Sequence, residues 1–130
     1  MTSDPHDEIA DDVRRFILTS IPSVPFMEAI LLFKALPGQA VETRSVGERL
    51  YVGEKQASTL VDQLRESRIV EAVPGTPAHR YAPPPELAEI LDRTALAYVH
   101  NLIGVTRIIH SRTERMAHQF ADAFRLRKDS

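Results

Sequence analysis

The stretch Ser45–Ala72 constrains the fold most strongly, because it holds two short amphipathic segments separated by only three residues. The break between them is Tyr51-Val52-Gly53, which is too short for anything other than a tight turn between two helices. Apolar residues recur at helical spacing around this break, at Val46, Leu50, Val52, Ala57, Leu60, Val61 and Leu64. The spacing predicts helices around Arg44–Tyr51 and Glu54–Ser67 that cross at a steep angle and share one core.

A β-hairpin is expected directly after the second of these helices. Ile69–Val73 contains β-branched residues, which favour strands, and Pro74-Gly75-Thr76-Pro77 has the composition of a turn. The chain can then return as a second strand over His79–Ala82. The connector Gln39–Thr43 could add a short extended piece.

A very apolar helix is expected before the two-helix unit. Ser23 can cap it, and Pro25 lies in its first turn, where proline is tolerated. Its apolar residues lie on most sides of the helix and are Phe26, Ala29, Ile30, Leu32, Phe33 and Leu36. A helix that is apolar nearly all round belongs in the centre of a core, and Pro37-Gly38 ends it.

Helices are also expected at both ends of the chain. Ser3 or Asp4 can cap the first one, which ends before Pro22 and carries a narrow apolar stripe at Ile9, Val13, Phe16 and Ile17. After Pro83-Pro84-Pro85, the chain is compatible with a helix from Glu86 to about Phe124. The apolar stripe of this segment consists of Leu87, Leu91, Tyr98, Leu102, Val105, Ile109, Met116, Phe120 and Phe124.

The middle of the C-terminal segment is its weakest part as a helix. Asn101, Gly104 and Thr106 lower the helix propensity there, so the sequence is compatible with one kinked helix or with two helices. An unbroken helix of this length would span about 57 Å, far more than the domain it follows. Much of its apolar stripe must therefore be buried against a partner. We predict a homodimer built from the N- and C-terminal helices.

The composition argues against several classes of protein. With 130 residues and 43% hydrophobic content, the chain is long enough for one domain with a core. It has no cysteine, which excludes disulfides and thiolate metal sites. No apolar stretch approaches the ~18 residues that a membrane span needs, and the acidic N-terminus is unlike a signal peptide. We therefore expect a cytoplasmic protein without a membrane partner.

Catalytic and metal-binding patterns are not found in the sequence. There is no Gly-rich phosphate loop, no nucleophile elbow and no placed pair of carboxylates. His110, Glu114 and His118 lie four apart on one helix face, but its ends are about 12 Å apart, so a polar face is a better interpretation than zinc. Tyr98, Phe120 and Phe124 could line an effector pocket, although a dimer core explains them better. We expect no enzymatic activity and no cofactor, and a small-molecule effector lacks support.

The order of residue types in Ser45–Ala72 matches a known pattern without a gap. Its elements are Val46-Gly47 and Leu50, then Val52 in the turn, then the apolar positions of the second helix, and Ile69-Val70 at the start of the hairpin. In this respect the chain resembles bacterial winged helix-turn-helix transcriptional regulators, the MarR-like and related groups. The resemblance covers about 60 residues, Ser23–Ala82. It implies a mainly α fold with a small β-hairpin wing, flanked by an N-terminal helix and a long C-terminal helix. It also implies that the Gln39–Thr43 connector pairs with the hairpin, as this segment often does in winged helices.

The resemblance also implies that the chain has three regions with different roles. Residues 1–21 would form an N-terminal helical arm, residues 22–82 the winged helix-turn-helix domain, and residues 83–130 a C-terminal helical dimerisation arm. A dimeric regulator of this kind places the second helix of its helix-turn-helix, here Glu54–Ser67, in the major groove of double-stranded DNA. The residues expected to contact DNA are Arg44, Lys55, Gln56, Ser58, Thr59, Gln63 and Arg80. Gln56 would suit adenine, and Lys55 would suit guanine or a phosphate.

The charge of the predicted domain supports an alternative. Between residues 21 and 82 there are seven basic residues, Lys34, Arg44, Arg49, Lys55, Arg65, Arg68 and Arg80, and seven acidic ones, Glu28, Glu42, Glu48, Glu54, Asp62, Glu66 and Glu71. Affinity for DNA comes largely from the neutralisation of phosphates, so a formally neutral domain is expected to bind weakly as a monomer. Two positions also depart from the family pattern: Gly53 replaces the usual Ser or Thr cap, and Arg68 replaces the usual left-handed Gly. The alternative is a winged-helix protein–protein interaction module that does not bind DNA.

Overall fold

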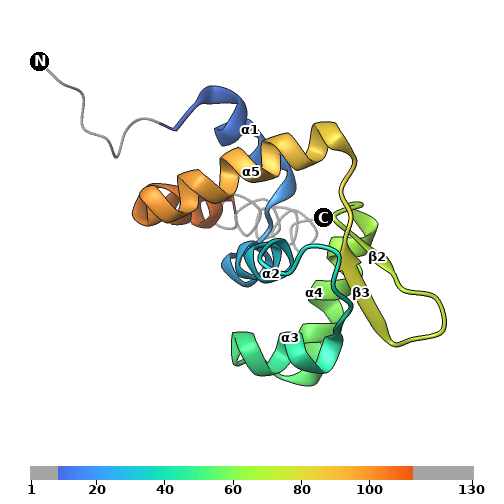
Figure 1. The fold of residues 1–130 in the computed structure, drawn as a ribbon. Helices are drawn as coiled ribbons and strands as arrows, with labels where there is room; N and C mark the ends of the chain where they lie inside the picture. The colour runs from blue at the N-terminus through green and yellow to red at the C-terminus, as the bar shows by residue number, and fades with distance from the viewer. Residues whose placement is uncertain (1–8, 113–130) are drawn as a thin grey trace, which may run out of the picture. The chain divides into compact units, whose positions relative to one another are not determined.

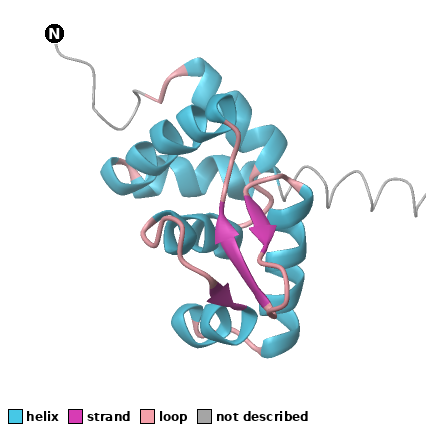
Figure 2. Ribbon diagram, turned by 45° about the vertical axis from the view of Figure 1, so that its right-hand side comes forward, coloured by secondary structure: helices cyan, strands magenta, loops and turns pink. Residues whose placement is uncertain are grey.

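The computed structural model describes residues 9–112, and these residues are mainly helical with a small antiparallel sheet (Figures 1 and 2). In chain order the elements are α1 (Asp11–Ser20), α2 (Val24–Lys34), β1 (Val41–Glu42), α3 (Thr43–Leu50), α4 (Glu54–Glu66), β2 (Val70–Ala72), β3 (Ala78–Tyr81) and α5 (Pro85–His100). Residues 102–112 are again helical. The described residues divide into two compact units, one of residues 24–95 and one that combines residues 9–23 with 96–112.

The central element of the unit formed by residues 24–95 is α2. It contacts α3, α4 and β3, and its Phe26, Met27, Ala29, Ile30 and Phe33 are buried. The other apolar residues buried in this unit are Val41, Val46, Ala57, Leu60, Val61, Leu64, Ile69, Val70, Ala78, Leu91 and Ala95. The prediction of a central, nearly all-apolar second helix is therefore confirmed.

The sheet has three strands in the order β1-β3-β2, and all neighbours are antiparallel. The connector before α3 contributes β1, whose Val41 lies opposite His79 of β3. The hairpin itself places Glu71 directly opposite Arg80, and its turn uses Gly75 at a positive φ of 76°. Both the hairpin and the pairing of the connector with it follow the expectation from the sequence.

The turn between α3 and α4 is held by backbone hydrogen bonds and close helix packing. The N–H group of Val52 donates to the carbonyl of Gly47 over 3.0 Å, and Tyr51 takes a left-handed conformation. A Cβ atom at Gly47 would lie 3.2 Å from the Val52 carbonyl oxygen and 3.4 Å from Cβ of Ala57. A glycine at this position thus allows α3 to approach the turn and α4 closely.

The first helix begins later than the sequence suggests. A start at Ser3 or Asp4 was expected, but Ile9 and Ala10 are not helical and α1 begins at Asp11. The carboxylates of Asp11 and Asp12 lie in the first turn, where they suit the positive end of the helix dipole. The earlier part of the expected helix, residues 1–8, lies outside the described residues.

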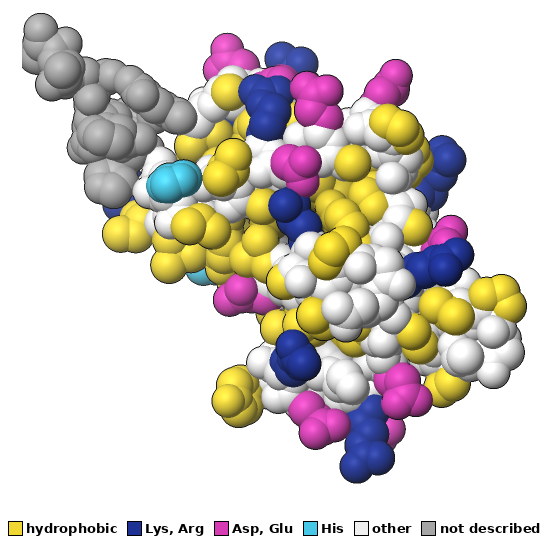
Figure 3. Space-filling model, in the orientation of Figure 1, with side chains coloured by type: hydrophobic (Ala, Val, Ile, Leu, Met, Phe, Trp, Pro, Cys, Tyr) yellow, Lys and Arg dark blue, Asp and Glu magenta, His cyan; other side chains and the backbone are white. Residues whose placement is uncertain are grey.

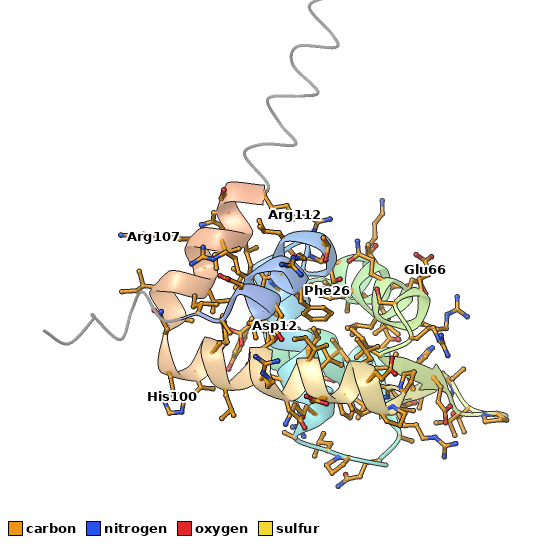
Figure 4. The ribbon with its side chains drawn as sticks, turned by 90° about the horizontal axis from the view of Figure 1, so that it is seen from above. Asp12, Phe26, Glu66, His100, Arg107 and Arg112 are labelled. Carbon is orange, nitrogen blue, oxygen red and sulfur yellow. The ribbon has the colours of Figure 1, made fainter. Side chains whose placement is uncertain are left out.

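The long C-terminal helix is broken at Asn101, as the weak middle of the segment allowed. The Asn101 side-chain oxygen accepts a hydrogen bond from the N–H group of Gly104 over 3.0 Å, as an N-cap residue does. A Cβ atom at position 104 would lie only 2.6 Å from Nδ2 of Asn101, so glycine leaves room for this cap. The chain therefore turns between His100 and Arg107, both of which are labelled in Figure 4.

This break changes which residues of the C-terminal stripe are buried. Val105 and Ile109 are buried as expected, but Leu102, the first residue of the helix that follows Asn101, is 52% exposed. The buried apolar residues of this unit are Ile9, Val13, Ile17, Ile21, Tyr98, Val105, Ile108 and Ile109. Residues 113–130, which carry the rest of the predicted stripe, lie outside the described residues. Among residues 9–112, no single helix is long and apolar enough to cross a membrane.

Candidate nucleic-acid interface

The outer face of α4 presents most of the residues that the sequence singled out. Lys55, Gln56, Ser58 and Thr59 are exposed, and Gln63 is half-buried. The opposite face of the helix carries the buried residues Ala57, Leu60, Val61 and Leu64. Helical periodicity therefore separates the two sets, and it brings the five predicted contact residues to one polar surface. Within residues 9–112, Lys55 takes part in no ion pair.

The two arginines predicted to contact DNA are both paired with carboxylates. Nε of Arg44 lies 3.5 Å from Oε1 of Glu48, one turn further along α3. Nε of Arg80 donates a hydrogen bond to Oε2 of Glu71, its direct neighbour across the β2–β3 pair. The Arg44–Glu48 pair is largely exposed and the Arg80–Glu71 pair is about half exposed, so each contributes little to stability. They do offset the positive charge that the two arginines would bring to a phosphate.

The surface around α3 is mixed in charge. On the face drawn in Figure 3, basic and acidic side chains alternate near α3 rather than forming a positive stripe. A groove of about 450 Å³ lies at the α3–α4 corner, lined by Arg44, Gly47, Glu48, Val52 and Glu54. Its two carboxylates and one paired guanidinium are consistent with the neutral charge count of the domain.

Two polar side chains of β3 lie partly inside the protein. Burial, together with the charge of Arg65, lowers the pKa of His79, while Asp62 opposes this shift. Burial raises the pKa of Tyr81 to about 12, and the carboxylate of Asp92 adds to this shift. Within the described residues, neither Nδ1 of His79 nor the hydroxyl of Tyr81 has a hydrogen-bond partner. We therefore regard both as parts of the packing of β3 rather than of the exposed interface.

Tyr51 is the residue at this surface that the sequence analysis missed. Its side chain is 95% exposed, and its φ of 56° lies in the left-handed region. Sequence reasoning treated Tyr51 only as part of the break between helices. A signal was present, because the residue just after a helix often takes the left-handed conformation and is usually Gly.

Metal and effector sites receive no support from the described residues. No group of three or more His, Asp or Glu side chains in residues 9–112 could hold a metal ion, and the chain has no cysteine. Of the set His110, Glu114 and His118, only His110 lies in the described part. Of the aromatic set proposed for an effector pocket or a dimer core, Tyr98 is buried, whereas Phe120 and Phe124 lie outside the described residues.

Comparisons of the chain with protein-family models, with curated proteins and with solved structures found no match.

Proposed function

We propose that residues 24–81 form a winged helix that binds double-stranded DNA as part of a transcriptional regulator, with α4 in the major groove. The observation that carries this proposal is the exposed polar face of α4, which combines Lys55, Gln56, Ser58, Thr59 and Gln63 next to a three-residue turn. Side chains near the start of such a helix are the ones that reach base edges. The β2–β3 hairpin lies after α4 in the chain, in the order that a wing requires.

We further propose that the regulator is a homodimer, because the unit with residues 96–112 exposes a patch of large apolar side chains. The patch consists of Leu96, Val99, Leu102 and Ile103, which are 59%, 69%, 52% and 63% exposed. Figure 3 shows hydrophobic side chains gathered on the molecule at the end of α5. Four neighbouring side chains of this size approach the ~300–600 Å² of the largest apolar patch on a typical monomer.

A second copy of the chain suits this patch better than a charged partner does. Residues 94–106 contain no Asp, Glu, Lys or Arg, so two copies of the patch can meet around a two-fold axis without opposing like charges. A stable interface needs about 800 Å² from each partner, more than the patch alone supplies. The sequence beyond residue 112 contains Met116, Phe120 and Phe124, spaced four apart, which would add apolar area.

Exchange of Lys55 or Gln56 for alanine is expected to weaken binding to a specific operator. The loss of a bidentate base contact by Gln56→Ala should lower the affinity by about 1–3 kcal/mol, roughly 5- to 150-fold. Lys55→Ala should also reduce the slope of log affinity against log salt by about 1 if the amine contacts a phosphate. Binding is measured by fluorescence anisotropy on an operator selected from random DNA.

Thermal unfolding separates these contacts from effects on the fold. Both side chains are exposed, so the midpoints of both variants should stay close to that of the wild type. Ser67→Ala, an exposed change just after the last residue of α4, serves as the matched control and should leave the affinity unchanged. If selection at low salt enriches no sequence on the wild-type protein, the proposal of DNA binding is wrong.

Removal of the carboxylate that faces Arg80 is expected to raise the affinity for DNA. In Glu71→Gln the Arg80 guanidinium loses its ionic partner and becomes available to a phosphate. One added phosphate contact makes the salt slope steeper by about 0.9, and near 0.1 M salt this corresponds to a several-fold tighter complex. Glu66→Gln is the matched control, because it removes the same charge from an exposed position outside the Arg80 pair. Equal affinities for Glu71→Gln, Glu66→Gln and the wild type would show that Arg80 does not lie at the DNA.

The paired arginines also favour the second candidate function, a winged helix that binds a protein instead of DNA. Arg44 and Arg80 are both neutralised by neighbouring carboxylates, and a nearly neutral polar surface is typical of protein interfaces. This module would yield a stoichiometric protein complex from its native cytoplasm. The complex should be lost in a variant with Glu54→Lys and Gln63→Glu. Recovery of nucleic acid alone would contradict this candidate.

A further inference from the structure

Tyr51 combines an almost fully exposed aromatic side chain with a left-handed backbone conformation. Its side chain is 95% exposed, so the ring contributes almost nothing to the core. Its φ of 56° places a bulky side chain in the left-handed region, where a non-glycine residue is strained. Strained residues of this kind gather at functional sites, where the surrounding structure holds them in place.

The backbone around Tyr51 is well defined by its neighbours. The N–H groups of Tyr51 and Val52 both donate to the carbonyl of Gly47, the latter over 3.0 Å. Val52 is half-buried, and α4 begins at Glu54. Glu54 is the third residue after Tyr51, so their Cα atoms lie within about 11 Å of each other. The backbone that carries the exposed ring is therefore held close to the start of α4.

We propose that Tyr51 contacts the DNA backbone next to the major groove that α4 enters, an inference that rests on the proposed DNA-binding function. The phenol hydroxyl would donate a hydrogen bond to a phosphate oxygen, and the ring would lie against the adjacent sugar. Tyrosine is one of the side chains that make such positioning contacts to phosphates. This contact needs no net positive charge, which matters on a surface where Arg44 and Arg80 are paired with carboxylates.

The test uses the opposite effects that the proposal predicts for stability and for binding. Tyr51→Gly removes the strain, so the midpoint of thermal unfolding should rise by a few degrees, on the order of 4 °C. The same change removes the ring and hydroxyl, so the affinity for the selected operator should fall about tenfold. Tyr51→Phe keeps both the strain and the ring. Its midpoint should match the wild type, while its affinity falls by a smaller factor through loss of the hydroxyl.

Arg68 provides the matched control. It lies just after the C-terminal end of α4, whereas Tyr51 lies just before the N-terminal end of α4. It is the second non-glycine residue with a positive φ in the described part, at 65°, and it is exposed. The 13 residues of α4 separate it from Tyr51 by about 20 Å, well beyond the Debye length of ~8 Å at 0.15 M salt. Arg68→Gly should therefore raise the midpoint as Tyr51→Gly does, with the affinity unchanged at that salt concentration.

The possible results distinguish the inference about Tyr51 from the proposed DNA-binding function on which it rests. A wild-type protein that enriches no DNA sequence overturns both. If the wild type binds its operator and Tyr51→Gly binds it equally well, Tyr51 is not a contact residue, whereas the proposed function stands. A fall in affinity for Arg68→Gly as large as for Tyr51→Gly also overturns the inference, because the loss would then follow from a change in α4 itself.

Discussion

A chain that carries Val99→Glu and Ile103→Glu is expected to be a monomer in solution, whereas the wild type is expected to be a dimer. Val99 and Ile103 belong to the exposed apolar patch and are 69% and 63% exposed. Burial of such a side chain contributes about 1.5–3 kcal/mol, and each enters a symmetric interface twice. The loss of these contacts, together with four buried carboxylates, should weaken dimerisation by more than about a hundredfold. Sedimentation equilibrium gives the mass of both proteins directly.

A control for this result adds the same charge elsewhere. Gln39→Glu with Ala40→Glu places two carboxylates on the exposed connector before β1 and should leave the dimer intact. Circular dichroism should show the same helix content in all three proteins, because the exposed patch contributes little to folding of the single chain. A monomeric wild type would contradict the proposed second copy and would point to another occupant of the patch, such as residues 113–130 of the same chain.

The proposed dimer bears directly on the proposed DNA binding. A neutral domain gains little from phosphate neutralisation, so we expect that two linked copies of α4 are needed to reach a useful affinity. The Val99→Glu and Ile103→Glu protein should therefore bind the operator far more weakly than the wild type, although it leaves every proposed DNA contact in place. Equal affinities for the monomer and the wild type would show that one copy is sufficient.

Leu64→Ala is expected to have the largest effect on the stability of the fold. Leu64 is completely buried on α4, and α4 contacts α2, α3 and β2. Removal of three buried carbons leaves a cavity and should lower the free energy of unfolding by about 2–5 kcal/mol. This is a large part of the 5–15 kcal/mol typical of a domain. The midpoint of urea unfolding measures the change.

The exposed face of the same helix supplies the comparison for Leu64. Ser58→Ala lies on α4 in an exposed position and should change the free energy of unfolding by less than about 0.5 kcal/mol. If Leu64→Ala changed the stability as little as Ser58→Ala, the inward face of α4 would not be the one described. The separation of a buried from a polar face, on which the proposed interface depends, would then be wrong.

Much of the secondary structure of this chain could be predicted from local patterns. The bounds of α2, α3, α4 and the hairpin follow within a residue or two from apolar spacing, turn residues and proline positions. The left-handed conformation of Arg68 was expected from its place after α4 and is confirmed. The start of α1 was predicted too early, because capping residues near Ser3 cannot show where tertiary packing of the helix begins.

The candidate site was predicted only in part. Periodicity alone separates Lys55, Gln56, Ser58 and Thr59 from the buried side of α4, so their exposure could be predicted. The Arg80–Glu71 pair depends on the register of β2 against β3, which the turn geometry sets and the local sequence does not reveal. Tyr51 was missed because exposure and backbone conformation at a turn depend on how the two flanking helices pack.

The sequence by itself determined which face of each helix is apolar, since the 3.6-residue period assigns every side chain of a helix to a side. It also determined where the chain turns, since Gly, Pro and the three-residue break permit few other conformations. Only the tertiary structure decided which apolar residues remain exposed. Leu102 belongs to the predicted stripe, yet it is exposed with Leu96, Val99 and Ile103, because the chain turns at the Asn101 cap and burial depends on neighbours distant in the sequence.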